Sequence, residues 1–327
     1  MSTSKNSNLH GAKKAKNDEF YTQLSDVSNE LKHYKQHFKD KIVFCNCDDP
    51  TWSAFWKYFH LNFHELGLKK LISTHYDKNE PTYKMEDDGT VQYSTVQYST
   101  VQYSTVQDID NDIEVGVKTP LQGNGDFRNQ ECIDLLKECD IIVTNPPFSL
   151  FREYVAQLIE YDKKFLIIGR CDVVNYKDFF PLLKNNKLWS GYNGVSIFNR
   201  PDGTTQTFGN IGWWTNLDIK KRHEPLILWQ RYYDDEGKPL PDVEERYPHY
   251  DNYNAINIDR IKNIPCDYYD VMGVPTSFAG SICPEQFEIL GNSRYHDNQD
   301  FADDINVING KAKYMRVLIK RVKREEE

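Results

Sequence analysis

The sequence predicts an α/β fold built on a parallel sheet, followed by a second region rich in β-structure. Between residues 41 and 184, short apolar runs alternate with segments of helical periodicity, which is the pattern of right-handed βαβ units. After about residue 186, Gly, Asn, Trp and Tyr become dense and the helical periodicity fades. A chain of 327 residues has room for one large domain or two modest ones.

The individual elements follow one another in the order that such units require. Helices are expected at residues 22–38, 52–66, 132–139, 150–161 and 178–184. Strands of the first region are expected at residues 41–45, 68–74, 141–144 and 164–169. Strands of the second region are expected at residues 211–217, 225–233 and 314–319, and the last of these either returns to the first sheet or completes the second region.

These elements divide the chain into four parts. We expect a flexible basic arm, an α/β domain, a β-rich region, and a C-terminal strand with a basic tail, at residues 1–17, 18–186, 187–310 and 311–327. Residues 91–107 repeat Val-Gln-Tyr-Ser-Thr three times and then close with Val-Gln. A five-residue period matches neither helix nor strand, so residues 78–118 are predicted to be an inserted surface loop or hairpin.

The charge and cysteine content exclude several classes of protein. A net charge of −9 argues against a protein that coats nucleic acid by charge alone, although local basic patches still permit a DNA enzyme. The seven cysteines have neither the spacing of a disulfide framework nor that of a zinc site. No apolar run reaches about 18 residues and nothing resembles a signal peptide. We therefore expect a cytoplasmic protein with reduced thiols, no structural metal and no membrane contact.

The tetrapeptide Asn145-Pro146-Pro147-Phe148 directly follows the apolar run at residues 141–144. The Asn145 side-chain carbonyl can accept a hydrogen from a planar amine, and prolines have no N–H, so the neighbouring backbone carbonyls are acceptors as well. Phe148 can stack on the ring that carries the amine. This combination fits N-methylation of adenine or of cytosine. The alternative is a Pro-Pro turn that ends a strand, with Phe148 in the core.

Two segments are candidates for holding a methyl donor. Phe20, Tyr21 and Thr22 precede the first predicted helix, where an aromatic ring and a hydroxyl can pack on a nucleoside; the alternative is an N-cap with a hydrophobic staple. The segment after the first strand contains Cys45, Asn46, Asp48 and Asp49, whose acids and carbonyls can bind an α-amino group. It lacks the usual glycine-rich loop, and the alternative is an Asp-Asp-Pro helix start.

A third candidate segment is the turn Gly125-Asp126-Phe127. A carboxylate followed by an aromatic ring after a glycine turn can bond an adenine amino group and cover the face of the adenine. The alternative is an ordinary Gly-Asp turn. Asp77, after the predicted strand at residues 68–74, is in position to bind ribose hydroxyls.

The order of these segments resembles that of the EcoRI-type adenine-specific DNA methyltransferase family. The resemblance covers nearly the whole chain outside residues 78–118, and the glycine-poor first loop is itself typical of that family. The segments that carry it are KKAKNDEFYTQ at 13–23, VFCNCDDP at 43–50, VTNPPFSLFRE at 143–153, GNIGWWTNL at 209–217 and VMGVP at 271–275.

The resemblance implies a Rossmann-like sheet that binds S-adenosyl-L-methionine, with a C-terminal region that recognises the target in double-stranded DNA. It implies a monomer that methylates N6 of a flipped-out adenine in a short palindromic site, beside a restriction endonuclease or alone. Asn145 and the Pro146 carbonyl would hold the amine. Phe148 would stack on one face of the base, and Trp213 or Trp214 on the other, with Trp214 favoured.

If the chain binds DNA as the resemblance implies, two clusters of basic residues are expected to contact its phosphates. Phosphate contacts are expected from Lys13, Lys14, Lys16, Lys220, Lys221 and Arg222, and such contacts set affinity rather than sequence preference. Otherwise these residues form solvated surfaces. Other substrates stay open for an amino methyltransferase with this tetrapeptide: an RNA base, a protein glutamine, or N4 of cytosine. A nucleic-acid-binding module without catalysis is the alternative from another class.

Overall fold

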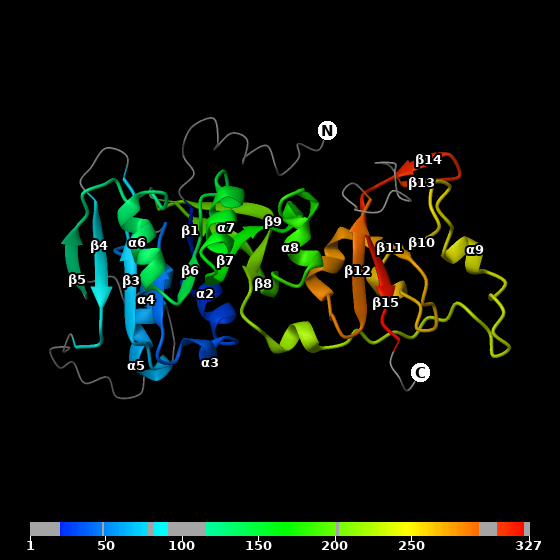
Figure 1. The fold of residues 1–327 in the computed structure, drawn as a ribbon, viewed down its shortest axis with the longest axis horizontal. Helices are drawn as coiled ribbons and strands as arrows, with labels where there is room; N and C mark the ends of the chain where they lie inside the picture. Colours follow the sequence, from blue (N-terminus) through cyan, green and yellow to red (C-terminus); the bar gives the residue numbers. More distant parts are fainter. Residues whose placement is uncertain are drawn as a thin grey trace. The chain divides into compact units, whose positions relative to one another are not determined.

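The computed structural model describes residues 20–47, 49–77, 82–90, 116–200, 203–293 and 306–323 (Figure 1). Lys13, Lys14, Lys16, Asp48 and the repeat at 91–107 lie outside these residues. The chain divides into two compact units, one made of residues 1–169 and 193–211 and the other of residues 170–192 and 212–327.

A nine-stranded sheet is the framework of the first unit, and its strand order is β1-β8-β9-β7-β6-β2-β3-β4-β5. Its strands are β1 Tyr21–Thr22, β2 Ile42–Cys45, β3 Lys70–Thr74, β4 Tyr83–Asp87, β5 Val117–Pro120, β6 Ile141–Thr144, β7 Lys164–Arg170, β8 Trp189–Asn199 and β9 Thr205–Thr215. The large sheet therefore extends past residue 187, where the sequence suggested a separate β-rich region to begin. The predicted strand at 211–217 is the second half of β9.

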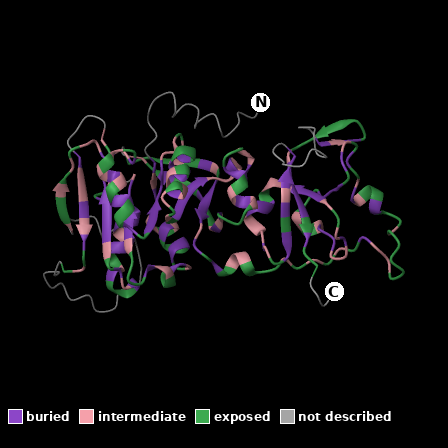
Figure 2. Ribbon diagram, viewed as in Figure 1, coloured by how far each residue is buried: buried purple, intermediate pink, exposed green. Residues whose placement is uncertain are grey.

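The centre of this sheet is parallel. β2 pairs with β3 on one side and with β6 on the other, and β6 pairs with β7. These strands are mostly buried, as their continuous apolar sequences predict (Figure 2). The chain crosses from β3 on one side of β2 to β6 on the other, so the connections change direction between β2 and β6. Ligands of open parallel sheets bind at such a point, outside the carboxyl ends of the strands.

The helices of the first unit agree with the predicted segments, and all but α6 are shorter than predicted. They are α2 Leu24–Leu31, α3 Lys35–Phe38, α4 Ala54–Leu61, α5 Phe63–Leu66, α6 Gln130–Glu138 and α7 Phe151–Glu160. The predicted helices at 22–38 and 52–66 are each divided into two. The second division is at Asn62, whose amide donates back to the Tyr58 carbonyl (2.7 Å). Ser53 caps the start of α4, because its hydroxyl accepts from two backbone N–H groups of the first turn.

The insertion predicted at residues 78–118 contains strand at both ends. β4 pairs with β5 in antiparallel fashion, so residues 88–116 connect two neighbouring strands of a hairpin. A buried hydrogen bond between His60 Nδ1 and Asp87 Oδ2 (2.6 Å) connects α4 to the end of β4. The described residues of the insertion thus add two strands to one end of the sheet (Figure 1).

The second unit contains a four-stranded sheet of order β10-β11-β15-β12 and a two-stranded hairpin, β13-β14. Its strands are β10 Ile256–Asn257, β11 Met272–Pro275, β12 Phe287–Asn292, β13 Asn306–Ile308, β14 Lys311–Lys313 and β15 Arg316–Arg321. Its helices are α8 Phe180–Lys184 and α9 Val243–Arg246, with 3₁₀ turns η2 Cys171–Asn175, η3 Lys220–His223, η4 Ile261–Asn263 and η5 Thr276–Ser281.

Two expectations for the second region have clear outcomes. The last strand, β15, lies between β11 and β12 and completes the second sheet rather than returning to the first. The predicted strand at 225–233 is wrong, because this segment forms only an isolated bridge between Gln230 and Pro265 and another between Tyr233 and Pro239. Its apolar run is instead partly exposed, and Ile227 is 91% exposed.

Candidate functional site

Asn145 follows β6 directly and is 7% exposed. Its Nδ2 donates to the backbone carbonyl of Phe20 (2.6 Å). Since a carbonyl only accepts, this bond fixes which way the amide points. Oδ1 is buried and has no hydrogen-bond partner among the described residues. The turn therefore offers one buried, oriented acceptor, which is costly to leave unused in a folded protein.

The prolines shape the turn into the start of α7. Pro146 is buried, and the Pro147 carbonyl accepts from Leu150 N (3.0 Å). Neither proline has an N–H that would compete for the Asn145 carbonyl. Phe148 is half-buried, and its ring lies nearly parallel to that of Phe20. Phe20 comes directly before β1, which pairs with β8 through Tyr21 and Thr22.

Three hydrogen-bonding side chains connect the turn after β6 to the loop after β2. The Thr144 hydroxyl donates to the Asn46 backbone carbonyl, and the Tyr154 hydroxyl donates to Asn46 Oδ1. All three residues are buried. Burial raises the pKa of the Tyr154 hydroxyl well above its usual value, so this group stays protonated and donates. We call Thr144, Asn46 and Tyr154 the brace.

The loop after β2 turns sharply. Cys47 has φ 81°, a left-handed conformation that glycine adopts without cost and other residues do not. Asp49, two residues later, accepts on Oδ1 from Tyr83 Oη and Thr51 (2.8 and 2.7 Å), and His75 Nδ1 lies 3.4 Å from its Oδ2. The loops after β2 and β3 are therefore joined through this carboxylate.

The Gly125-Asp126-Phe127 turn packs on the segment that follows β3. Gly125 has φ +71°, and a Cβ there would overlap the carbonyl oxygen of His75. Asp77 N also donates to the Asn124 carbonyl (3.3 Å). The segments that the sequence predicts to bind the donor, after β2, after β3 and at Gly125, thus contact one another just beyond the carboxyl ends of β2 and β3.

The Asp126 carboxylate is already paired. Arg128 donates to both of its oxygens, from Nε to Oδ1 (2.8 Å) and from Nη2 to Oδ2 (2.6 Å). These bonds hold the pKa of the Asp126 carboxyl below its usual range. Phe127 is buried and its ring meets Tyr154 edge-on (5.1 Å, 83°), so this turn also contacts the brace.

Trp213 and Trp214 lie in the last part of β9, which from Gly212 onward belongs to the second unit, and both are buried, at 1% and 2% exposure. Trp214 Nε1 donates to the Arg170 carbonyl (3.2 Å), and its ring packs edge-on to Phe179 (5.1 Å). Alternation along β9 predicted that one of the two rings would be exposed to a site, but both lie inside. A base could stack on either ring only after that ring became exposed.

The predicted basic cluster of the second unit is partly engaged in contacts of its own. Lys221 Nζ donates to the Gly191 carbonyl (2.5 Å), and the Arg222 guanidinium lies over the Trp189 ring, 3.7 Å from its centroid. Lys220 is exposed. Of this cluster, Lys220 is the residue most accessible to a phosphate.

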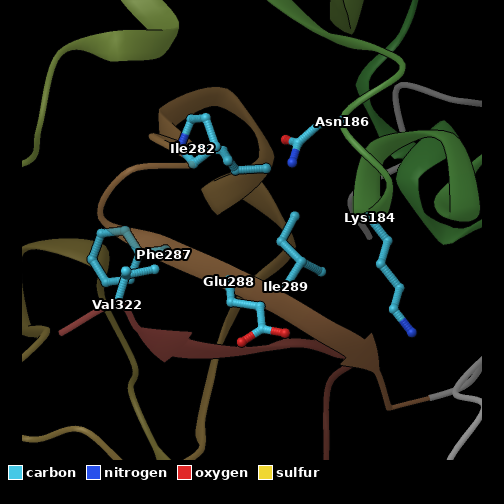
Figure 3. A pocket seen from close by; sticks show the side chains of 8 residues that line it. Lys184, Asn186, Ile282, Phe287, Glu288, Ile289 and Val322 are labelled. Carbon is cyan, nitrogen blue, oxygen red and sulfur yellow. The ribbon is translucent and has the colours of Figure 1, made fainter.

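A pocket of about 230 Å³ lies in the second unit (Figure 3). Its lining residues come from α8 and the following turn, from β12 and from the segments beside it: Lys184, Asn186, Ile282, Pro284, Phe287, Glu288, Ile289 and Val322. None of the residues predicted to hold the donor or the amine lines it. Within the described part of the chain, no group of His, Cys, Asp and Glu has the arrangement of a metal site, and no helix is long and apolar enough to cross a membrane.

The sequence did not identify every residue that shapes this site. Tyr154, Tyr83 and Arg128 each contact a predicted donor-binding residue, yet none belongs to a motif. Tyr154 has a local signal, because it lies on the apolar face of α7 with Phe151, Val155 and Leu158, at helical spacing. That spacing predicts burial but not its partner, Asn46, which is 108 residues away.

Comparison with known proteins gives consistent matches over almost the whole chain. The family described as adenine-specific methyltransferase EcoRI matches residues 8–322. Type II methyltransferase M.EcoRI from Escherichia coli is 45% identical over 330 residues, covering 95% of both chains. Type II methyltransferases M.MpnI from Mycoplasma pneumoniae and M.MgeORF184P from Mycoplasma genitalium are 35% and 34% identical, each covering 95% of this chain and 97% of its own. No solved structure matches the chain.

Proposed function

Because the chain belongs to the adenine-specific EcoRI methyltransferase family, we propose that it methylates N6 of an adenine in a short palindromic DNA site. The methyl donor is S-adenosyl-L-methionine. The enzyme works as a monomer, alone or beside a restriction endonuclease that cuts the same site. The parallel strand order around β2 and β6 supports a Rossmann-like donor-binding domain.

The observation that carries this proposal is the open Oδ1 of Asn145. This atom is buried, fixed by the bond from Nδ2 to Phe20, and has no partner among the described residues. One hydrogen of an adenine N6 amine fits it, and the Pro146 carbonyl accepts the second. Phe148, half-buried beside them, stacks on the base. Trp213 or Trp214 on the other face stays a prediction that requires a buried ring to become exposed.

The residues along the sheet edge fit a nucleoside with an α-amino acid tail. Asp126 accepts from the adenine amine and Phe127 covers the ring, while Asp77 binds ribose hydroxyls. Tyr21 and Thr22, with Cys45, Asn46, Asp48 and Asp49, surround the amino acid portion. The close packing of Gly125 on the His75 carbonyl supports this arrangement, because it brings the turn against the loop after β3.

When bound, S-adenosyl-L-methionine supplies a methyl group on a positively charged sulfur, which is already electrophilic. The protein therefore needs no covalent intermediate. Asn145 and the Pro146 carbonyl bond the amine more strongly as its nitrogen becomes tetrahedral, which lowers the barrier rather than only increasing substrate affinity. The brace holds the amine turn and the donor loop at a fixed separation, so positioning contributes most of the catalysis.

A stacked adenine cannot reach a buried acceptor, so the base must leave the duplex. Phosphate contacts from Lys13, Lys14, Lys16, Lys220, Lys221 and Arg222 set the affinity and its dependence on salt. The second unit reads the target sequence.

Methyl incorporation tests this proposal. The purified protein is incubated with labelled donor and duplex DNA, and the DNA is digested to nucleosides. Label in N6-methyladenine supports the proposal. Label in N4-methylcytosine, or transfer only to RNA or protein supplied in parallel, overturns it. Sequencing of methylated DNA from cells that express the chain then identifies the site.

A further inference from the structure

We propose that Phe20 is the second wall of the slot that receives the target base, opposite Phe148. This inference deepens the proposed function and rests on it. It assigns to Phe20 a contact with the methyl acceptor, in place of the donor contact that its sequence position suggested.

The two rings have the relative orientation that a planar base requires. The planes of Phe20 and Phe148 differ by 17°, and their centroids are 6.4 Å apart. A base between two rings needs about 3.5 Å on each side, or about 7 Å in total. The two ring planes must therefore lie about 7 Å apart when the base is bound between them. Phe148 is half-buried, so its ring can move to admit a base. Phe20 is only 6% exposed, so its ring stays in place.

Two further rings stand at right angles to this pair. Phe208 meets Phe20 edge-on (4.7 Å, 86°) and Phe148 edge-on (6.0 Å, 89°). Phe198 meets Phe148 edge-on (5.9 Å, 87°). Both are buried, at 2% and 0% exposure. Phe208 therefore contacts both walls of the proposed slot and Phe198 contacts Phe148, so the four rings form one aromatic cluster.

The backbone of Phe20 links the slot to the amine-binding atom. Its carbonyl accepts from Asn145 Nδ2, so the residue that forms one wall also orients Oδ1. The pairing of Tyr21 with Asn199 and of Thr22 with Phe198 holds β1 against β8, directly after Phe20. A base between Phe20 and Phe148 would thus meet a fixed acceptor next to both rings. Trp214, by contrast, is held in the interior of the second unit by Arg170 and Phe179.

The test compares Phe20→Leu, Phe20→Tyr and a matched control, Phe38→Leu. Phe38 is also buried and packs edge-on to Phe59 (5.0 Å, 81°), so its replacement removes the same ring from another part of the first unit. Single-turnover methyl transfer is measured on an unmethylated duplex that contains the target site of the enzyme. Donor affinity is measured by calorimetry, and stability by thermal unfolding. Stacking of an aromatic side chain on a base contributes about 1–3 kcal/mol of binding free energy, so Phe20→Leu should slow methyl transfer about 10- to 100-fold.

The other measurements separate this role from a structural one. Donor affinity of Phe20→Leu should stay within about twofold, and Phe20→Tyr, which keeps a ring, should restore the rate. Phe38→Leu should lower thermal stability comparably yet leave the rate unchanged. A target adenine opposite an abasic site leaves the duplex more easily, so the Phe20→Leu defect should shrink there.

The inference is overturned if Phe20→Leu transfers at the wild-type rate, or if donor affinity falls as much as the rate. It is also overturned if the defect is the same on the abasic substrate, because stacking then plays no part in holding the base. A wild-type protein that forms no N6-methyladenine would instead refute the proposed function. The two failures are therefore distinct.

Discussion

The turn after β6 differs from the loop after β2 and from the Gly125-Asp126-Phe127 turn in how its polar groups are satisfied. At the β6 turn, Asn145 Oδ1 is buried and has no partner among the described residues. At the other loops, Asp49 is bonded to Tyr83 and Thr51, and Asp126 is bonded to Arg128.

Under the proposed function, this difference predicts that the side that binds the amine and the side that binds the methyl donor meet their ligands differently. The amine side is preorganised, because a neutral acceptor can stay buried and open at moderate cost. The donor side contains carboxylates, and an unpaired carboxylate is far more costly to desolvate. Its acids therefore keep protein partners until a ligand replaces or joins them. We expect substitutions on the amine side to change the rate of transfer and those on the donor side to change donor affinity.

The largest effect is expected for Asn145→Ala. It removes the open acceptor, and loss of one transition-state hydrogen bond typically costs about 10²- to 10³-fold in rate. DNA and donor affinity should change little. Methyl transfer and DNA binding are measured side by side, with Asn62→Ala as a control that removes a partly buried amide elsewhere in the first unit. Equal loss of transfer and DNA binding would show that Asn145 is structural.

Tyr154→Phe should have the next largest effect, because it removes the brace bond to Asn46. Asn46 Oδ1 is left without that donor, which should lower the free energy of unfolding by about 1–3 kcal/mol. The amine turn and the donor loop lose their fixed spacing, so transfer should slow roughly tenfold.

Tyr34→Phe is the matched control for the brace. The Tyr34 hydroxyl is also buried and donates to Glu30 (2.7 Å), away from the sheet edge. It should lower stability comparably but leave the rate of transfer unchanged. If both variants slow transfer equally at matched stability, the brace has no special role.

Arg128→Met tests the donor side and should have a smaller effect. Arg128 is substantially exposed, so loss of its ion pair with Asp126 should cost only about 0.2–1 kcal/mol of stability. If the donor must displace Arg128 from Asp126, the variant should bind the donor up to about fivefold more tightly. Calorimetry of donor binding decides this, with Lys137→Met as a control for an exposed ion pair on α6. Weaker donor binding would show that Arg128 positions Asp126 instead.

The same ion pair should give a defined pH dependence. The pKa of Asp126 is lowered in the folded protein, so its contribution is fully present above the unfolded carboxyl pKa of about 3.9. It is lost as the pH falls through the lower, folded value. The difference in free energy of unfolding between wild type and Arg128→Met should therefore be largest at neutral pH and should decrease below about pH 4, as measured by denaturant unfolding. A difference that is unchanged in acid would contradict this assignment.

The smallest effect is expected for deletion of residues 91–105. Since β4 and β5 pair with each other, the connection between them only closes a hairpin, and shortening it changes stability by about 1 kcal/mol or less. Transfer and thermal unfolding should both stay close to wild type. Unfolding of the deletion variant would show that the repeat contributes to the fold.

Local sequence predicted those elements whose signal is contained within a few residues. The apolar run before Asn145 gave strand β6 with its bounds, because a buried parallel strand needs only continuous apolar residues. Helix ends were less accurate, since the break at Asn62 depends on a single amide bonding back to the helix. The predicted strand at 225–233 failed because the run is apolar, yet its neighbours offer it only isolated bridges.

By itself, the sequence determined the family, the parallel sheet and the position of the turn that we propose binds the amine, because each depends on motifs and periodicities that are contiguous in the chain. Only the tertiary structure decided what surrounds that turn. Asn145 meets Phe20 across 125 residues, and Tyr154 meets Asn46 across 108. Such contacts follow from the packing of distant elements, which is set by the whole chain and leaves no local pattern. These contacts hold Asn145 Oδ1 in one orientation, while the carboxylates of Asp49 and Asp126 bond to neighbouring side chains.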